Sequence, residues 1–124
     1  MATALNMRIL IADDNDIVRR GVRGLLSTES DWTVCGEARD GSEALQKARE
    51  LLPDVVLLDV SMPDVSGLEV ARRLRLEMPK AKLLIISQHD PRLILPSVLA
   101  AGGNGCLDKG RLAADLVATI KGFR

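Results

Sequence analysis

Short apolar runs alternate five times with longer amphipathic segments along the 124 residues, and this alternation limits the possible folds more than any other feature. The strand-like runs are Met7–Ala12, Trp32–Ala38, Val55–Leu58, Leu83–Ile86 and a weaker Gly105–Leu107. The segments between and after them carry apolar residues at helical spacing. Repeated βα units of this size predict a parallel sheet with helices on both faces. We therefore expect one α/β domain over residues 1–124.

The fourth helical segment, Pro91–Ala101, contains an interior proline, Pro96. Asp90 and Pro91 are suited to be the N-cap and first helical residue. A proline inside a helix lacks a backbone donor, costs about 3 kcal/mol or more and biases the preceding residue away from helical angles. We expect this helix to be kinked, or to begin only near Pro96 and leave residues 91–95 loose with exposed apolar side chains.

Charge and cysteine content exclude several classes of protein. Seventeen basic and seventeen acidic residues give no net charge, so no nucleic-acid or membrane surface is indicated. No apolar run approaches the roughly 20 residues of a membrane-spanning helix, and the first residues do not resemble a secretory signal. The two cysteines form no CxxC pair, so neither a disulfide framework nor a zinc site is predicted. A cytoplasmic protein is expected.

Polar side chains stand where the predicted strands end. Asp13 and Asp14 follow the first strand, Asp59 the third, Ser87 the fourth and Lys109 the fifth. Open α/β sheets bind ligands beyond the carboxyl ends of their strands. Carboxylates that converge there need a compensating charge, and Mg²⁺ is suited to oxygen ligands of this kind. A carboxylate beside Mg²⁺ and a lysine is equipped to accept a phosphoryl group.

Each of these residues alone has a simpler interpretation. Asp13 and Asp14 could cap the following helix, Ser87 could be an ordinary hydroxyl at a strand end, and Lys109 could be a solvated surface charge. The combination at four strand ends favours a site.

At these residues the chain resembles a known family, the receiver domain of two-component response regulators, and in particular its NarL/FixJ (LuxR-type) subfamily. The resemblance covers the chain from about Met7 to its end. It rests on IADDN (Ile11–Asn15), LLDVSMPDVSGLE (Leu57–Glu69), the serine after LLII, and AGGNGCLDK (Ala101–Lys109). It implies a flavodoxin-like fold with five parallel strands in the order 2-1-3-4-5.

The resemblance also implies roles for the polar residues. Asp59 would be the phosphoacceptor, and a sensor histidine kinase would supply the phosphoryl group. Asp14 would bind Mg²⁺ directly, Asp13 mostly through water, and the backbone carbonyl of Ser61 would be a further ligand. Lys109 would hold a phosphoryl oxygen.

Ser87 would be the switch hydroxyl that moves when Asp59 is phosphorylated. In the family, a Tyr or Phe on the fifth strand is its partner; Cys106 stands there, which leaves the usual aromatic readout in doubt. Cys35 and Cys106 should not form a disulfide, because the second and fifth strands lie at opposite edges of the implied sheet. The fourth helix, fifth strand and fifth helix would form the output face and could mediate a homodimer.

The function expected from this interpretation is phosphoryl-dependent switching in two-component signalling and not enzymatic turnover. NarL/FixJ relatives continue into a helix-turn-helix DNA-binding domain, so we expect a missing transcription-regulator domain to be the output, while the receiver itself contacts neither nucleic acid nor membrane. A stand-alone or degenerate receiver that acts as a protein-interaction module is the alternative. A haloacid-dehalogenase-like phosphatase is disfavoured, because that class needs a second Asp where Ser61 stands.

Overall fold

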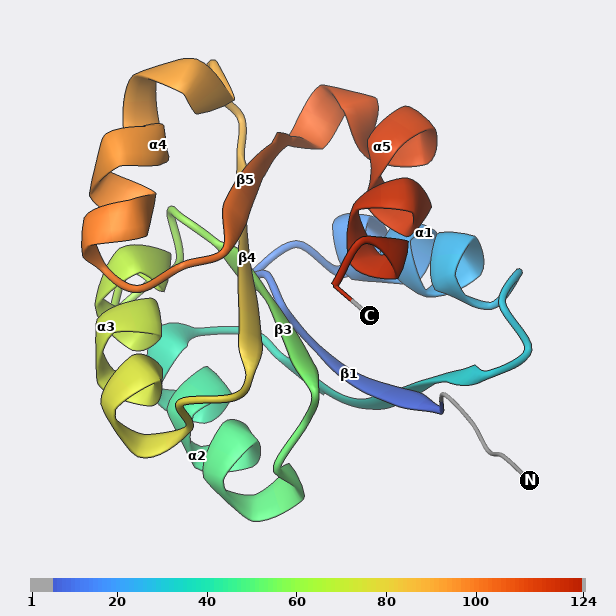
Figure 1. Cartoon of the computed structure of the whole chain (residues 1–124), viewed down its shortest axis with the longest axis horizontal. Coiled ribbons are helices and arrows are strands. Elements are labelled where there is room, and N and C mark those ends of the chain that lie inside the picture. The colour runs from blue at the N-terminus through green and yellow to red at the C-terminus, as the bar shows by residue number, and fades with distance from the viewer. Residues whose placement is uncertain (1–5, 124) are drawn as a thin grey trace.

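Five parallel strands form one sheet in the computed structural model, which describes residues 6–123 (Figure 1). The strand order β2-β1-β3-β4-β5 confirms the predicted flavodoxin-like topology. The strands are β1 (Met7–Ala12), β2 (Trp32–Ala38), β3 (Val55–Asp59), β4 (Lys82–Ser87) and β5 (Gly105–Asp108). Each predicted strand is present, and β3, β4 and β5 extend slightly further than the apolar runs alone indicated.

Five helices cover the two faces of the sheet, with α2, α3 and α4 on one side and α1 and α5 on the other (Figure 1). They are α1 (Asp16–Leu26), α2 (Gly41–Leu51), α3 (Gly67–Glu77), α4 (Pro91–Ala100) and α5 (Leu112–Lys121), and a short 3₁₀ turn, Lys109–Arg111, precedes α5. No helix among residues 6–123 is long and apolar enough to cross a membrane.

Alternate residues of each central strand feed two separate cores. In β1, Leu10 and Ala12 pack toward α2, α3 and α4, whereas Ile9 and Ile11 pack toward α1 and α5. This follows from the two-residue period of a strand. Because both faces are covered, the central strands must be apolar on both sides, and all of β3 is buried, including its final residue, Asp59.

Side-chain caps fix where the helices begin. Asn15 accepts hydrogen bonds from the backbone N–H groups of the first turn of α1, and Asp40 caps α2 in the same way. The Ser66 hydroxyl accepts a hydrogen bond from the Glu69 backbone N–H at 3.2 Å and so caps the start of α3. These caps satisfy N–H groups that have no partner within the helix.

Helix α4 excludes one of the two alternatives predicted for it, a start near Pro96. It begins at Pro91, so residues 91–95 are helical and not a loose segment. The Asp90 carboxylate caps it through the Arg92 backbone N–H at 2.9 Å. Pro96 has no backbone N–H to donate within the helix, but it is exposed, so the carbonyl that loses this donor can bind water instead. Val98 is fully buried and packs the helix against the core. Exposed apolar side chains are present as expected, at Leu93, Leu95 and Leu99.

The two edge strands are irregular or short. In β2 the pairing with β1 shifts, from Ile9 opposite Val34 to Leu10 opposite Gly36, so that Cys35 is passed over. At the other edge, β5 has only four residues. Cys35 and Cys106 lie on these opposite edges and are both free, as predicted.

Candidate functional site

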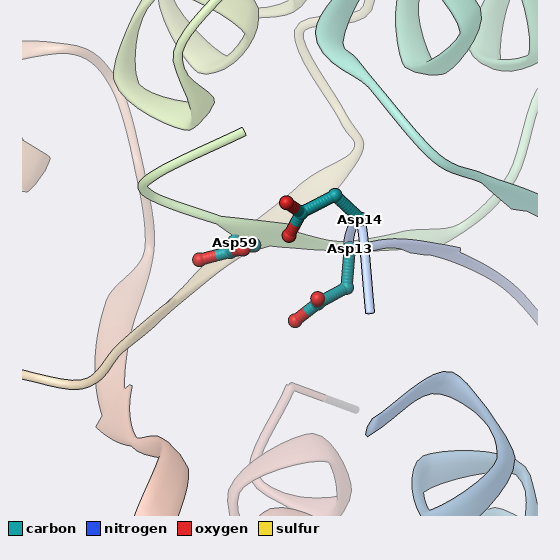
Figure 2. A group of neighbouring side chains, drawn as sticks. All are labelled: Asp13, Asp14 and Asp59. Atoms are coloured by element: carbon teal, nitrogen blue, oxygen red, sulfur yellow. The ribbon is translucent and has the colours of Figure 1, made fainter. Parts of the chain in front are cut away.

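Three carboxylates meet at the carboxyl edge of the sheet. Asp13 and Asp14 follow β1, and Asp59 ends the neighbouring β3. Each offers an oxygen that lies within 4.8 Å of the other two. Figure 2 shows the three side chains projecting from these two strand ends into the same space. The structure therefore brings together the three acids that the sequence predicted as a cluster.

Lys109 joins this cluster from the first residue of the 3₁₀ turn that follows β5, and so lies at the end of the fifth strand as predicted. Its Nζ lies 2.9 Å from Asp13 Oδ2 and 3.2 Å from Asp59 Oδ2. The Asp108 carboxylate accepts a hydrogen bond from the Gly110 backbone N–H at 2.8 Å, which fixes the turn that carries the lysine. The ammonium thus bridges the ends of β1 and β3.

The cluster holds more negative than positive charge. Among the described residues, Lys109 is the only cation that forms ion pairs with these carboxylates. Burial raises the pKa of Asp59, and the nearby Asp13 charge raises it further, although the Ser61 backbone N–H and Lys109 oppose both effects. Burial alone would lower the pKa of Lys109, but its ion pairs with Asp13 and Asp59 outweigh this and raise it. A cation bound here would relieve the excess of negative charge.

Asp13 and Asp14 differ in how the protein holds them. Asp13 is only 1% exposed; its Oδ1 accepts a hydrogen bond from the Asn15 backbone N–H at 2.9 Å. Its Oδ2 lies beside the lysine but accepts no hydrogen bond of good geometry within residues 6–123. Asp14 is exposed, and its carboxylate has no hydrogen bond or ion pair among the described residues. A carboxylate without protein partners, such as that of Asp14, is suited to bind a metal ion and its water.

The two predicted serines are placed differently. The Ser61 backbone N–H donates to Asp59 Oδ1 at 3.2 Å, and its side chain is exposed. The Ser87 hydroxyl is fully buried at the end of β4 and accepts a hydrogen bond from the His89 backbone N–H at 3.0 Å. In the part of the chain that the structure describes, no hydrogen bond joins Ser87 to Asp59 or Lys109. Ser87 is therefore next to the cluster by strand order but is not part of its hydrogen-bond network.

The loop after Asp59 leaves no room for a side chain at Gly67. A Cβ there would lie 2.2 Å from the Asp59 carbonyl oxygen, and the Gly67 N–H donates to the Val60 carbonyl at 3.2 Å. The start of α3 is thereby packed directly against the backbone of the candidate nucleophile.

One buried residue of this region, Arg19, was not identified from the sequence. It lies on α1, is 8% exposed, and its Nη1 donates to the backbone carbonyl of Asp13 at 2.6 Å. Its position was visible in the pattern, because it shares the buried stripe of α1 with Val22 and Leu26. A charged residue on an apolar stripe needs a buried partner, and that signal could have indicated it.

Comparison with known proteins identifies the class. A family model for the response regulator receiver domain matches residues 9–121, and the chain belongs to this family. It is thus a receiver domain of two-component signal transduction, a signalling domain whose family members interact with sensor histidine kinases.

Several of the individual matches are regulators of the NarL and LuxR type, which agrees with the predicted subfamily. The response regulator GacA of Pseudomonas viridiflava is 39% identical over 93% of this chain and 54% of its own length. The receiver domain of the response regulator NarL from Mycobacterium tuberculosis is 34% identical, with a TM-score of 0.84 over 96% of this chain and 99% of that one. A LuxR-family regulator from Aurantimonas has 33% identity and a TM-score of 0.89 over 95% and 84%. The chain spans about half the length of the curated relatives it matches.

Proposed function

We propose that Asp59 is the phosphoacceptor of this receiver domain and takes its phosphoryl group from a phosphohistidine of a sensor histidine kinase. The observation that carries the proposal is the buried arrangement in which Lys109 bridges Asp13 and Asp59 at 2.9 and 3.2 Å. A structural ion pair would need one carboxylate for one ammonium, whereas three carboxylates lie together here. Such an excess is typical of a site that binds a cation and a substrate.

In the proposed transfer, an Asp59 carboxylate oxygen attacks the phosphorus atom. The new O–P bond forms as the P–N bond to the histidine breaks, and that nitrogen keeps the electron pair. The fixed orientation of Asp59 supports this role, because β3 and the Ser61 N–H hold its carboxylate at the rim of the sheet. Lys109 would stabilise negative charge on a phosphoryl oxygen.

The acids fit a magnesium ion, because Mg²⁺ prefers oxygen ligands and keeps several waters. Asp14 and Asp59 would bind it directly, Asp13 mostly through water, and the Ser61 carbonyl would complete the protein ligands. The engagement of Asp13 by Lys109 and the freedom of Asp14 support this division. When bound, the ion supplies charge neutralisation for the incoming phosphoryl group.

Downstream, we propose that phosphorylation switches the face formed by α4, β5 and α5, with Ser87 moving toward the modified Asp59. Leu93, Leu95 and Leu99 on α4 are exposed and could contact an output domain or a second copy of the chain in a homodimer. The output would be a DNA-binding transcription-regulator domain, as the name of a DNA-binding LuxR-family response regulator from Staphylococcus aureus, 25% identical in sequence, suggests. The receiver would act as a switch, assisting only its own phosphorylation and dephosphorylation.

The test uses the unphosphorylated domain, Mg²⁺ and acetyl phosphate, with intact-protein mass spectrometry as the readout. We expect the wild type to gain one phosphoryl group and Asp59→Asn to gain none. Glu50→Gln, which removes an exposed carboxylate of α2, is the control and should be labelled like the wild type. Full labelling of Asp59→Asn would overturn the assignment, and an unlabelled wild type would favour a degenerate receiver that acts as an interaction module.

A further inference from the structure

Arg19 is a buried cation beside the acidic cluster that the proposed phosphoryl transfer does not use. Besides its hydrogen bond to the Asp13 carbonyl oxygen, its Nε donates to Glu37 Oε1 on β2 at 3.1 Å, and it forms an ion pair with Asp16. Among residues 6–123, none of its hydrogen bonds or ion pairs reaches the carboxylates of Asp13, Asp14 or Asp59. Arg19 thus contacts the main chain of the cluster and not its charged groups.

The carbonyl that Arg19 holds belongs to the peptide group between Asp13 and Asp14. Because a peptide group is planar, fixing its oxygen also fixes the N–H of Asp14 and the direction in which the chain presents that residue. The preceding peptide is held too, since the Asp13 N–H donates to the Ala38 carbonyl on β2 at 3.0 Å. The backbone on both sides of Asp13 is therefore fixed by neighbouring elements.

Asp14 depends on this backbone support more than the other two acids do. Asp59 accepts a hydrogen bond from Ser61, and Asp13 accepts one from Asn15. Within the described residues Asp14 has no such bond, so the protein directs its side chain only through the position of the main chain. A ligand held only by its backbone is precise only if that backbone is rigid.

The charge of Arg19 is matched away from the cluster. Asp16 and Glu37 pair with its guanidinium, and Arg23 also pairs with Glu37 at 3.2 Å. The guanidinium therefore leaves the negative charge of the three acids available to a cation. We propose that Arg19 is a positioning residue that fixes the Asp13–Asp14 peptide so that the Asp14 carboxylate can bind Mg²⁺. This inference rests on the magnesium site proposed above.

The test measures the Mg²⁺ affinity of the unphosphorylated domain. NMR titration of the backbone amides is suitable, because it also detects weak binding. Arg19→Gln should weaken binding roughly tenfold, at the lower end of the usual effect of an outer-shell partner. Arg19→Lys keeps the charge but has a single donor nitrogen, which cannot bind the Asp13 carbonyl and Glu37 as the guanidinium fork does. Its weakening of Mg²⁺ binding should therefore be intermediate. Arg20→Gln is the matched control, because Arg20 is exposed on the same helix; it should bind like the wild type.

A double-mutant cycle separates positioning from a general loss of structure. If Arg19 acts through Asp14, Arg19→Gln should weaken binding in the wild-type background and have little further effect in an Asp14→Asn background. Equal weakening in both backgrounds would overturn the inference, since it would show a loss that does not pass through Asp14. Thermal unfolding in EDTA, monitored by circular dichroism, checks that each variant is folded.

The remaining outcomes are also decisive. If Asp14→Asn weakens Mg²⁺ binding but Arg19→Gln binds like the wild type, the positioning role is wrong and the magnesium site stands. If the wild type itself binds no Mg²⁺, the proposed site falls and this inference falls with it. Should Arg19→Gln fail to fold, Arg19→Lys decides, and a wild-type affinity in that variant would overturn the proposal.

Discussion

Replacing the candidate phosphoacceptor should stabilise the domain when no metal is bound. Asp59 is 3% exposed and has oxygens within 4.8 Å of other carboxylates. At an effective dielectric constant of about 20 and the upper limit of 4.8 Å, repulsion from Asp13 amounts to at least about 3.5 kcal/mol. Attraction by Lys109 at 3.2 Å amounts to about 5 kcal/mol. Repulsion from the exposed Asp14 and the penalty for burying a carboxylate, typically several kcal/mol, also oppose the charged form of Asp59. Together these unfavourable effects outweigh the attraction by Lys109. We expect Asp59→Asn to raise the free energy of unfolding in EDTA at pH 7 by about 1–2 kcal/mol.

The sign of the pH dependence follows from the raised pKa of Asp59. A carboxyl group with a raised pKa in the folded state binds its proton more tightly there than in the unfolded chain. Its stabilising contribution is complete below the unfolded pKa of about 3.9 and is lost as the pH rises through the folded pKa. The difference in stability between Asp59→Asn and the wild type should therefore be small in acid and grow as the pH rises through the raised pKa of Asp59.

Urea unfolding at several pH values, monitored by the fluorescence of the buried Trp32, measures this difference. Mg²⁺ should reverse the order, because a ligand at about one hundred times its dissociation constant stabilises the protein that binds it by about 2.7 kcal/mol. Glu50→Gln controls for the change in net charge alone. An Asp59→Asn protein that is less stable than the wild type in EDTA at pH 7 would refute the reasoning.

Three further predictions concern the same framework. Lys109→Met should lower the free energy of unfolding in EDTA by roughly 3 kcal/mol, because it leaves buried carboxylates without their cation; an unchanged urea midpoint would contradict this. Gly67→Ala should destabilise the domain by about 1–3 kcal/mol, because the new Cβ clashes with the Asp59 carbonyl. Gly24→Ala, in open space on α1, should stabilise it by about 0.5–1 kcal/mol. Equal shifts of the thermal midpoint in the two variants would be evidence against the clash. Hydrogen exchange should be faster in α4 than in α2, since only Val98 of α4 is buried; equal protection would contradict this.

The fold and the acidic cluster could be predicted from the sequence because both follow from local patterns. Strand ends in a parallel sheet share one edge, so residues after successive apolar runs must meet there once the strand order is known. Asp13, Asp14, Asp59 and Lys109 were found in this way. The strand order itself does not follow from these patterns; the resemblance to receiver domains implied that β1 lies beside β3, and the structure has the same order.

The features that could not be predicted depend on how helices and strands pack against one another and on side-chain rotamers. The acceptor of the Arg19 guanidinium depends on how α1 lies over the ends of β1 and β2, which no sequence period encodes. The Ser87 hydroxyl points to a local backbone N–H, a choice of rotamer that strand order leaves open. The sequence left open whether residues 91–95 are helical, because the packing of Val98 against the core, which opposes the penalty for Pro96, depends on tertiary structure.

The irregular edges of the sheet have a consequence for self-association. An exposed strand edge is a template on which another chain can add a strand, and short or bulged edges discourage this. Here β5 offers only four residues, and the register of β2 slips at Cys35. Both edges therefore disfavour the addition of a strand from another chain, which could lead to fibres or swapped dimers. We therefore expect any specific pairing between copies of this chain to use helix surfaces and not strand edges.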